Sequence, residues 1–372
     1  MKAKLRNLFS LLVGGLFVYW FAHKLNWIEV WAEVREANWA QLALALSLFI
    51  GTYFVRVLRW QTLLSPLAQT SLKALFRATV IGFSALFIMG RAGEMIVRPA
   101  ALSAKEKIHP SACYATVMVE RVFDMVMVVV FFAVNMVFFE FTSDDVEAMQ
   151  ILGWIKVTGA LLLVASLAGI YGLSVFSRRR ARALAYLEDR LKWLPVTIKK
   201  GLISLLSHIS ESLGVLHDAK ELTIVVSYTL LLWTMVAVAH LLVVRAFGIP
   251  YKVIPFTGAV FVMGLSMLGS VVPTPGGATG PFHTATAASL LFLGVESNKA
   301  ASVAIILHLV IFAPATFFGL FYVIKDGLSL ENLKRIGEKQ SEDVDKLSQT
   351  TQPKEQEESA EQGDSKVAAV QG

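Results

Sequence analysis

Eight charged residues are grouped at helical spacings within stretches that are otherwise apolar enough to cross a membrane. In chain order they are Arg56, Arg59, Arg91, Glu94, Arg98, Glu120, Arg121 and Asp124. An ionised side chain at the bilayer centre costs roughly 2.5–3.5 kcal/mol on insertion scales, so these residues must be paired or in contact with water. Because the five arginines outnumber the three carboxylates, a shared cavity would prefer an anion, and the planar donor fork of arginine suits phosphate.

Helical spacing places several of these residues together. Arg56 and Arg59 are three apart and share one helix face. They either bind an anion there or extend to cytoplasmic lipid phosphates at the end of the helix, and the spacing leaves both readings open. Arg91, Glu94 and Arg98 recur at intervals of three and four, so a helix that begins at the preceding glycine would carry them as one stripe.

The remaining charges form a second group on a later stretch. Glu120 and Asp124 are four apart on one face, and Arg121 can reach Asp124 three residues on. One reading is a polar cavity that these side chains shape and neutralise. The other is a buried ion-pair lock that pins this helix to Arg91 or Arg98.

A different constellation combines helix-breaking residues with a histidine. It comprises Pro273, Pro275, Gly276, Gly277, Gly280 and His283. Such a break offers free backbone amides and the positive end of a short helix, which together can hold an anionic group. His283 could add a donor that responds to protonation, whereas we expect His240 and His308 to be packed polar residues.

The motifs of common enzyme classes are missing. The sequence has no zinc-protease pair of histidines, no phosphate-cradling Walker loop and no nucleophile elbow. Its only cysteine is Cys113, which rules out a disulfide framework or a cysteine zinc cluster. We therefore expect no metal and no cofactor, and the net charge of +6 comes without the basic and aromatic motifs of nucleic-acid binding.

The composition requires a membrane around these residues. Hydrophobic residues make up 55% of the 372 residues and charged residues only 17%, against about a quarter charged in soluble domains. A spanning helix needs about 20 apolar residues. Six full spans are predicted, at residues 8–22, 39–64, 113–139, 151–176, 222–247 and 300–324.

Two further apolar stretches are interrupted by glycine and proline. They cover residues 72–102 and 253–293 and read as helix, break, helix. Each is predicted to be a re-entrant hairpin that returns to the side from which it started, with paired full spans as the alternative. The fold class is thus an all-α, polytopic membrane helical bundle with six full spans and two helix-break-helix hairpins, arranged like an inverted repeat.

The distribution of lysine and arginine predicts the orientation. The basic, amphipathic segment 177–220 is placed on the cytoplasmic surface, which also puts both termini in the cytoplasm. The first span follows three basic residues without a cleavage pattern and is expected to remain as an anchor. Residues 1–325 form the membrane domain, and the charged tail 326–372 is expected to be disordered.

Four motifs in order resemble one known family. They are RVLRW at 56–60, GRAGE at 90–94 with Arg98 and Pro99, Glu120 and Arg121 with Asp124, and PTPGG at 273–277 with Gly280, Phe282 and His283. Over about residues 5–325 the chain resembles the flippase-like family, the membrane region of lysylphosphatidylglycerol synthases. The soluble aminoacyl-transferase domain has no counterpart in the tail, so we do not expect synthase activity. Some relatives have an acidic residue after the second break, where this chain has His283.

Together these features predict a translocase in the bacterial inner membrane for an anionic lipid or a polyprenyl-phosphate carrier. Arg56, Arg59, Arg91 and Arg98 would bind the headgroup phosphate, and the break at 273–283 would form the opposing gate. One alternative is a membrane glycosyl or acyl transferase with Glu120 or Asp124 as its base, or an accessory subunit of such an enzyme. Another is a scaffold in which the charged residues only lock the helices together. The expected partners are anionic membrane lipids and lipid-biosynthesis enzymes.

Overall fold

The computed structural model describes most of the proposed membrane domain. The described residues are 15–23, 25–89, 91–138, 150, 153–154, 156–161, 163–165, 168–169, 171–172, 219–272 and 274–325. Regular structure in these ranges is helical, without strands. Parts of the expected span 151–176, nearly all of segment 177–220 and the tail 326–372 lie outside them.

Among the described residues, three helices are long and apolar enough to span a membrane. They are α3 (Trp39–Leu64), residues 220–246 of α10 (Ala219–Ala246) and α14 (Ser297–Lys325). They correspond to the predicted spans 39–64, 222–247 and 300–324. The predicted span 113–139 is one continuous helix of 29 residues, α6 (Pro110–Phe138), which carries three of the charged residues near its N-terminal end. The described part of span 8–22 is helical from residue 15.

Both interrupted stretches fold as pairs of short helices. The first consists of α4 (Leu72–Met89) and α5 (Arg91–Glu106), which pack closely together. The second consists of α11 (Phe256–Gly269) and α13 (Pro281–Phe292), with the single turn α12 (Pro275–Ala278) in the break. At about 1.5 Å per residue, α11 and α13 are each shorter than the roughly 30 Å hydrocarbon core.

Glycines allow the helices of each hairpin to approach closely. A Cβ atom on Gly82 in α4 would lie 2.5 Å from the Cβ of Arg98 in α5, and one on Gly269 would lie 2.5 Å from the carbonyl oxygen of Pro281. In the second break, Gly276 and Gly277 have φ values of 74° and 68°, a left-handed conformation that suits glycine. The chain can therefore reverse direction there without a strained side chain.

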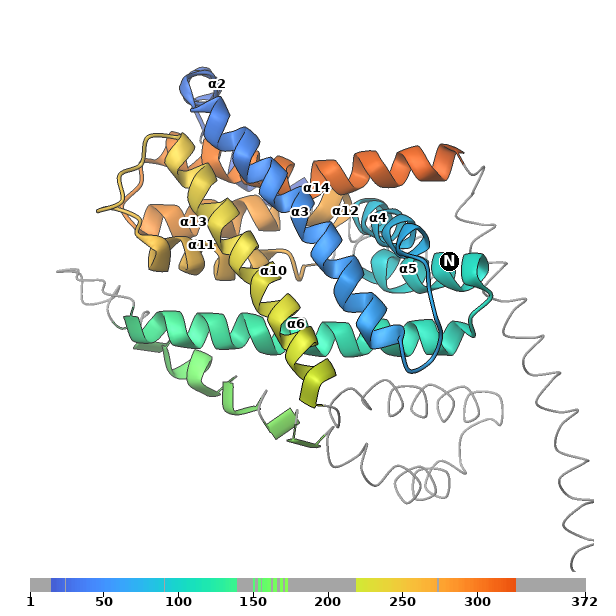
Figure 1. Ribbon diagram of the computed structural model, residues 1–372. Coiled ribbons are helices and arrows are strands. Elements are labelled where there is room, and N and C mark those ends of the chain that lie inside the picture. The colour runs from blue at the N-terminus through green and yellow to red at the C-terminus, as the bar shows by residue number, and fades with distance from the viewer. Residues whose placement is uncertain are drawn as a thin grey trace, which may run out of the picture.

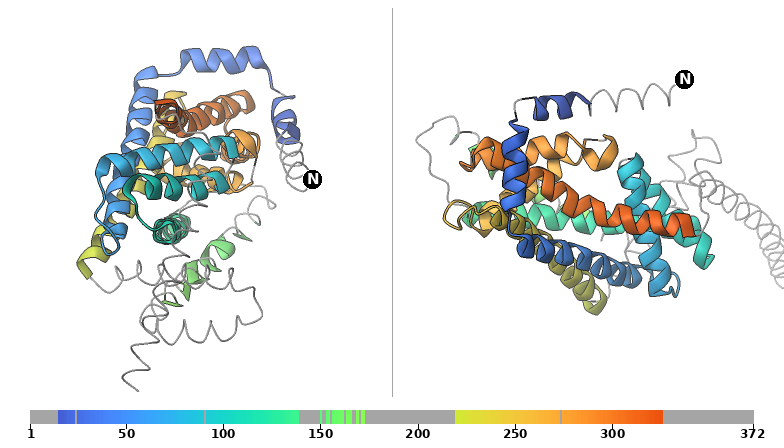
Figure 2. Two further views of the ribbon diagram at one scale, coloured as in Figure 1. Left: turned by 90° about the vertical axis from the view of Figure 1, so that its right-hand side faces the viewer. Right: turned by 90° about the horizontal axis from the view of Figure 1, so that it is seen from above.

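The described helices form two sets with the same order of lengths. A long helix, two shorter helices and a long helix occur as α3, α4, α5, α6 and again as α10, α11, α13, α14. The most extensive contacts join α3 to α10, and the last helix of each set contacts the first short helix of the other, α14 with α4 and α6 with α11. Figure 1 shows α3 and α10 in front of the bundle, and the right-hand view of Figure 2 shows α4 and α5 crossing α14.

Apolar packing surrounds the charged part of α3, α5 and α6. One core cluster joins residues of α3, α4, α5 and α6, including Trp60, Leu75, Leu102 and Cys113. A larger cluster joins α3, α10 and the second hairpin to α14. The charged residues of α3 and α6 are therefore held between two apolar layers and do not face open water.

Candidate functional site

Three helices bring the charged residues together. Seven of the eight form one buried cluster, which we call the charge cluster: Arg56 and Arg59 from α3, Glu94 and Arg98 from α5, and Glu120, Arg121 and Asp124 from α6. The eighth residue, Arg91, begins α5, and its side chain lies outside the described part. The first and last members of the cluster, Arg56 and Asp124, are 68 positions apart in the sequence.

Glu120 lies at the centre of the charge cluster. Its Oε1 atom is 2.9 Å from Arg59 Nη2, 2.9 Å from Arg98 Nη1 and 3.1 Å from Arg121 Nη2. The Glu120 side chain is fully buried, as are those of Arg59 and Arg98. Three guanidinium groups therefore converge on a single carboxylate oxygen in a place from which water is largely excluded.

Asp124 connects the cluster to a second part of the bundle. Its Oδ1 accepts hydrogen bonds from Arg59 Nη1 at 2.7 Å and from Trp233 Nε1 of α10 at 3.2 Å. Its Oδ2 is 3.3 Å from Arg121 and 3.5 Å from Arg56. The i to i+3 pairing of Arg121 with Asp124 is the one expected from helical spacing.

Aromatic side chains orient the arginines. The guanidinium carbon of Arg98 lies 4.1 Å from the ring centre of Trp60, and the Trp60 Nε1 donates to Thr116 Oγ1 at 3.0 Å. Arg56 lies over the ring of Phe83 at 5.4 Å. Stacking of this kind fixes the plane of a guanidinium group, so the directions of the Arg98 N–H groups are set by α3.

The charges within the described cluster do not balance. Four arginines face three carboxylates, which leaves one positive charge in excess. Several buried atoms also lack a hydrogen-bond partner among the described residues, namely Nε and Nη2 of Arg98, Nε of Arg59 and Oε2 of Glu120. Buried polar atoms are normally satisfied by protein or by ordered water, so these atoms keep donor and acceptor capacity that the described residues do not use.

Two expectations about the arginines can now be decided. Arg59 is fully buried and Arg56 nearly so, and both contact carboxylates of α6. The reading in which they extend to lipid phosphates beyond the helix end is therefore wrong, because α6 supplies counterions at their own level. The ion pair between α6 and Arg98, which the lock reading requires, is present at 2.9 Å.

The second constellation is organised by two histidines. His283 Nδ1 accepts the backbone N–H of Gly280 at 3.2 Å, and His308 Nε2 lies 3.1 Å from the carbonyl oxygen of Gly277. The two rings are 4.5 Å apart between centres. The Gly280 amide is thus already bonded and not free for an anion. Because His283 Nδ1 accepts this bond, the donor of the neutral ring is its other nitrogen, Nε2.

The structure describes only some of the other residues of the break. Pro273 lies outside the described residues, and Pro275 starts α12. Gly277 is pressed against Phe312 of α14, where a Cβ atom would lie 2.7 Å from the ring. Of the contacts given above, those of the break lead to α14. Those of the charge cluster join α3, α5 and α6 to one another and to α10.

Several contributing residues escaped the sequence reasoning. His308 is buried, as expected of a packed polar residue, but its contact with the break was not predicted. The bonds of Thr229 and Trp233 of α10 to Arg59 and Asp124 were not predicted either. Their only signal in the sequence is a polar group inside an apolar span, which does not identify a partner. The described residues contain no group of three metal-binding side chains.

The comparisons with known proteins agree with the resemblance noted in the motifs. A family model described as the lysylphosphatidylglycerol synthase TM region matches residues 7–319. The chain belongs to this family. No curated protein and no solved structure gives a match.

Membership of the lysylphosphatidylglycerol synthase TM region family indicates that the apolar helices lie in a membrane. Together with the three helices that can span a bilayer, it shows a multi-pass membrane protein. The match includes α3, α5 and α6, which carry the charge cluster, and the break between α11 and α13. Both constellations therefore belong to the membrane region that defines the family.

In this family member the histidine pair can be tested directly. Replacing His308 with leucine removes the donor to the buried Gly277 carbonyl, and we expect a loss of about 1–3 kcal/mol in stability. Cys113 is the only cysteine and is buried, so its reaction with a thiol-reactive dye during heating reports unfolding. His23→Leu, at an exposed position, is the control. Equal melting temperatures for the two variants would show that the histidine bond does not stabilise the break.

Proposed function

We propose that this protein is a translocase for an anionic, phosphate-bearing lipid in the bacterial inner membrane. The observation that carries the proposal is the convergence of three guanidinium groups on Glu120 Oε1 within a buried cluster that has one excess positive charge. A buried charge without a counterion is costly. A phosphate group entering the cluster would supply the missing negative charge.

The unused donors match the chemistry of a phosphate. Nε and Nη2 of Arg98 lie on one edge of its guanidinium plane and lack partners among the described residues. Two parallel N–H groups of this kind bind two oxygens of a phosphate. Arg121 is the most exposed side chain of the cluster, at 23%, which makes it the first contact for a headgroup that arrives from the membrane or the cytoplasm.

The arrangement of the helices supports a mechanism of alternating exposure. The two sets of helices would be inverted halves, each with two spans and a re-entrant hairpin between them, and one half would rock against the other. The charge cluster would hold the headgroup, and the break at 273–283 would act as the gate on the opposite side. Six spans and cytoplasmic termini complete this topology.

Lipid crossing in reconstituted vesicles tests the proposal. We expect Arg121→Gln to lower the rate for a fluorescent phosphatidylglycerol by about tenfold, which corresponds to the loss of one charge-assisted contact. Lys299→Gln, which removes a partly exposed charge paired with Glu33 on the other side of the bundle, is the matched control. No acceleration of crossing by the unaltered protein would refute the translocase.

A structural lock is the second candidate, because every described member of the cluster has an ion-pair partner within it. A lock predicts that charge-removing variants lose melting temperature and activity together. The translocase predicts that Arg121→Lys, which keeps the positive charge but lacks the guanidinium fork, also loses transport while its melting temperature, followed through Cys113, stays close to that of Lys299→Gln. The two measurements on the same variants therefore separate the candidates.

A further inference from the structure

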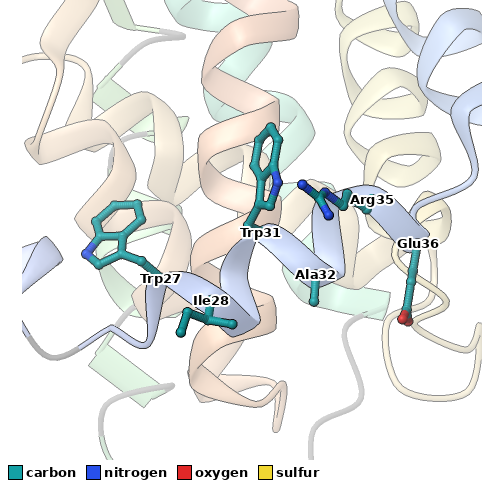
Figure 3. A pocket seen from close by; sticks show the side chains of 6 residues that line it. All are labelled: Trp27, Ile28, Trp31, Ala32, Arg35 and Glu36. Carbon is teal, nitrogen blue, oxygen red and sulfur yellow. The ribbon is translucent and has the colours of Figure 1, made fainter.

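Helix α2 (Trp27–Glu36) presents an unusual surface for a segment between two membrane stretches. Trp27 is 53% exposed, Ile28 83% and Trp31 56%. These residues line an open groove of about 580 Å³ together with Ala32, Arg35 and Glu36. Figure 3 shows Trp27, Trp31 and Arg35 on one side of α2, and Ile28, Ala32 and Glu36 on the other. We call these six residues the α2 groove.

The orientation of α2 is fixed by contacts on its opposite face. Val30 and Val34 are buried, and the Val30 carbonyl accepts a hydrogen bond from Ser302 Oγ of α14 at 3.2 Å. Glu33 pairs with Lys299 of α14 at 3.3 Å. These contacts hold α2 against the start of α14, so the exposed tryptophans are the outer face of a well-anchored helix.

The position of α2 relative to the spans places the groove at a membrane surface. In the left-hand view of Figure 2, α2 lies crosswise at the beginning of α3. α3 has 26 residues, and at about 1.5 Å per residue it exceeds the roughly 30 Å hydrocarbon core, so its ends reach the headgroup layer. Only Ala37 and Asn38 separate α2 from α3, which keeps α2 within that layer.

The chemistry of the groove fits lipid headgroups. Tryptophan concentrates at the membrane interface because its ring is apolar while its N–H needs a polar partner. The Arg35 guanidinium lies 5.4 Å from the ring centre of Trp31, so an apolar surface and a cation are side by side. An acyl chain can pack on the rings while Arg35 binds the phosphate of the same lipid.

We propose that α2 is an interfacial helix whose groove binds phospholipids of the headgroup layer, with Arg35 on the phosphate. This assignment does not depend on transport by the charge cluster. It gives a function to a segment that, from the sequence, is only a connection between spans.

Spin labels on single introduced cysteines test the proposal in vesicles of phosphatidylcholine and phosphatidylglycerol. Labels at Trp31→Cys and Ile28→Cys are used, and the buried Cys113 of the unaltered chain serves as the labelling background. Collisions with oxygen report lipid, and collisions with a water-soluble nickel complex report water. Lys252→Cys, in the exposed turn after α10, is the control.

The expected result is an oxygen-to-nickel collision ratio at least about threefold higher at both α2 positions than at the control, as for an interfacial helix. Arg35→Gln should remove the part of this difference that depends on phosphatidylglycerol. A nickel-dominated signal at both positions overturns the proposal in favour of exposure to water. Low collision rates with both reagents also overturn it: spin–spin broadening then identifies a second copy of the chain, and its absence shows that another part of the same chain covers α2.

Discussion

Glu120→Gln is expected to lower the free energy of unfolding by about 3–5 kcal/mol, the usual cost of leaving buried charges without their partner. Glu120 Oε1 is the common acceptor for Arg59, Arg98 and Arg121. A neutral amide at this position would leave three guanidinium groups in mutual repulsion. The melting temperature followed through Cys113, in the same detergent for all variants, measures the effect.

The size of this effect depends on the burial of Glu120, so an exposed glutamate is the matched control. Glu36 on α2 is exposed, and Glu36→Gln should melt close to the unaltered protein. A second variant, Glu120→Gln with Arg98→Gln, removes one of the crowded positive charges and should recover part of the stability. Equal melting of Glu120→Gln and Glu36→Gln would contradict the central role of Glu120.

Gly82→Ala should cost about 1–3 kcal/mol in stability and most of the transport activity, because the added methyl group overlaps Arg98. The new Cβ would lie 2.5 Å from the Arg98 Cβ and 3.1 Å from its Cα. Since a backbone atom cannot turn aside as a side chain does, α5 must move away from α4. That movement displaces the Arg98 guanidinium from Trp60 and Glu120.

Two readouts identify this mechanism. Lipid crossing and melting temperature should both fall for Gly82→Ala, whereas Gly15→Ala, with open space around its Cβ position, should change neither. The additional truncation Arg98→Ala in the Gly82→Ala background should cause little further loss of transport, because the arginine is already misplaced. Full transport by Gly82→Ala would show that the position of α5 is not critical.

Local patterns predicted the helices well where apolar residues are continuous. The span predicted at 39–64 is observed at Trp39–Leu64, and its start follows from Asn38, whose side chain accepts the Gln41 N–H. The break predicted after residue 89 is observed there. The second break, predicted to begin at Pro273, begins earlier because α11 ends at Gly269. Both predictions rest on glycine and proline, which act within one turn of chain. Whether the hairpins are re-entrant stays a prediction, because no membrane boundary follows from helix lengths alone.

Seven of the eight charged residues singled out from the sequence meet in the charge cluster, but only part of their pairing was predicted. The spacing of Arg121 and Asp124 indicated their contact, since both lie on one helix. The bond from Arg59 to Asp124 joins positions 65 residues apart, and that from Trp233 to Asp124 positions 109 apart. Such pairs depend on how α3, α6 and α10 pack. The bonded state of the His283 ring likewise depends on the left-handed glycines and not on the histidine itself.

The contacts of Asp124 have a consequence for the proposed rocking of the two sets of helices. Asp124 and Arg59 belong to the first set of helices, yet they bond to Trp233 and Thr229 on α10 of the second. Any sliding of α10 along α3 must stretch these bonds. The stability of the α3–α10 interface, which we call the seam, is therefore coupled to the ion pairing within the charge cluster. By reciprocity, an anion that competes with Asp124 for Arg59 would loosen the seam, and a closed seam would weaken the hold on the anion.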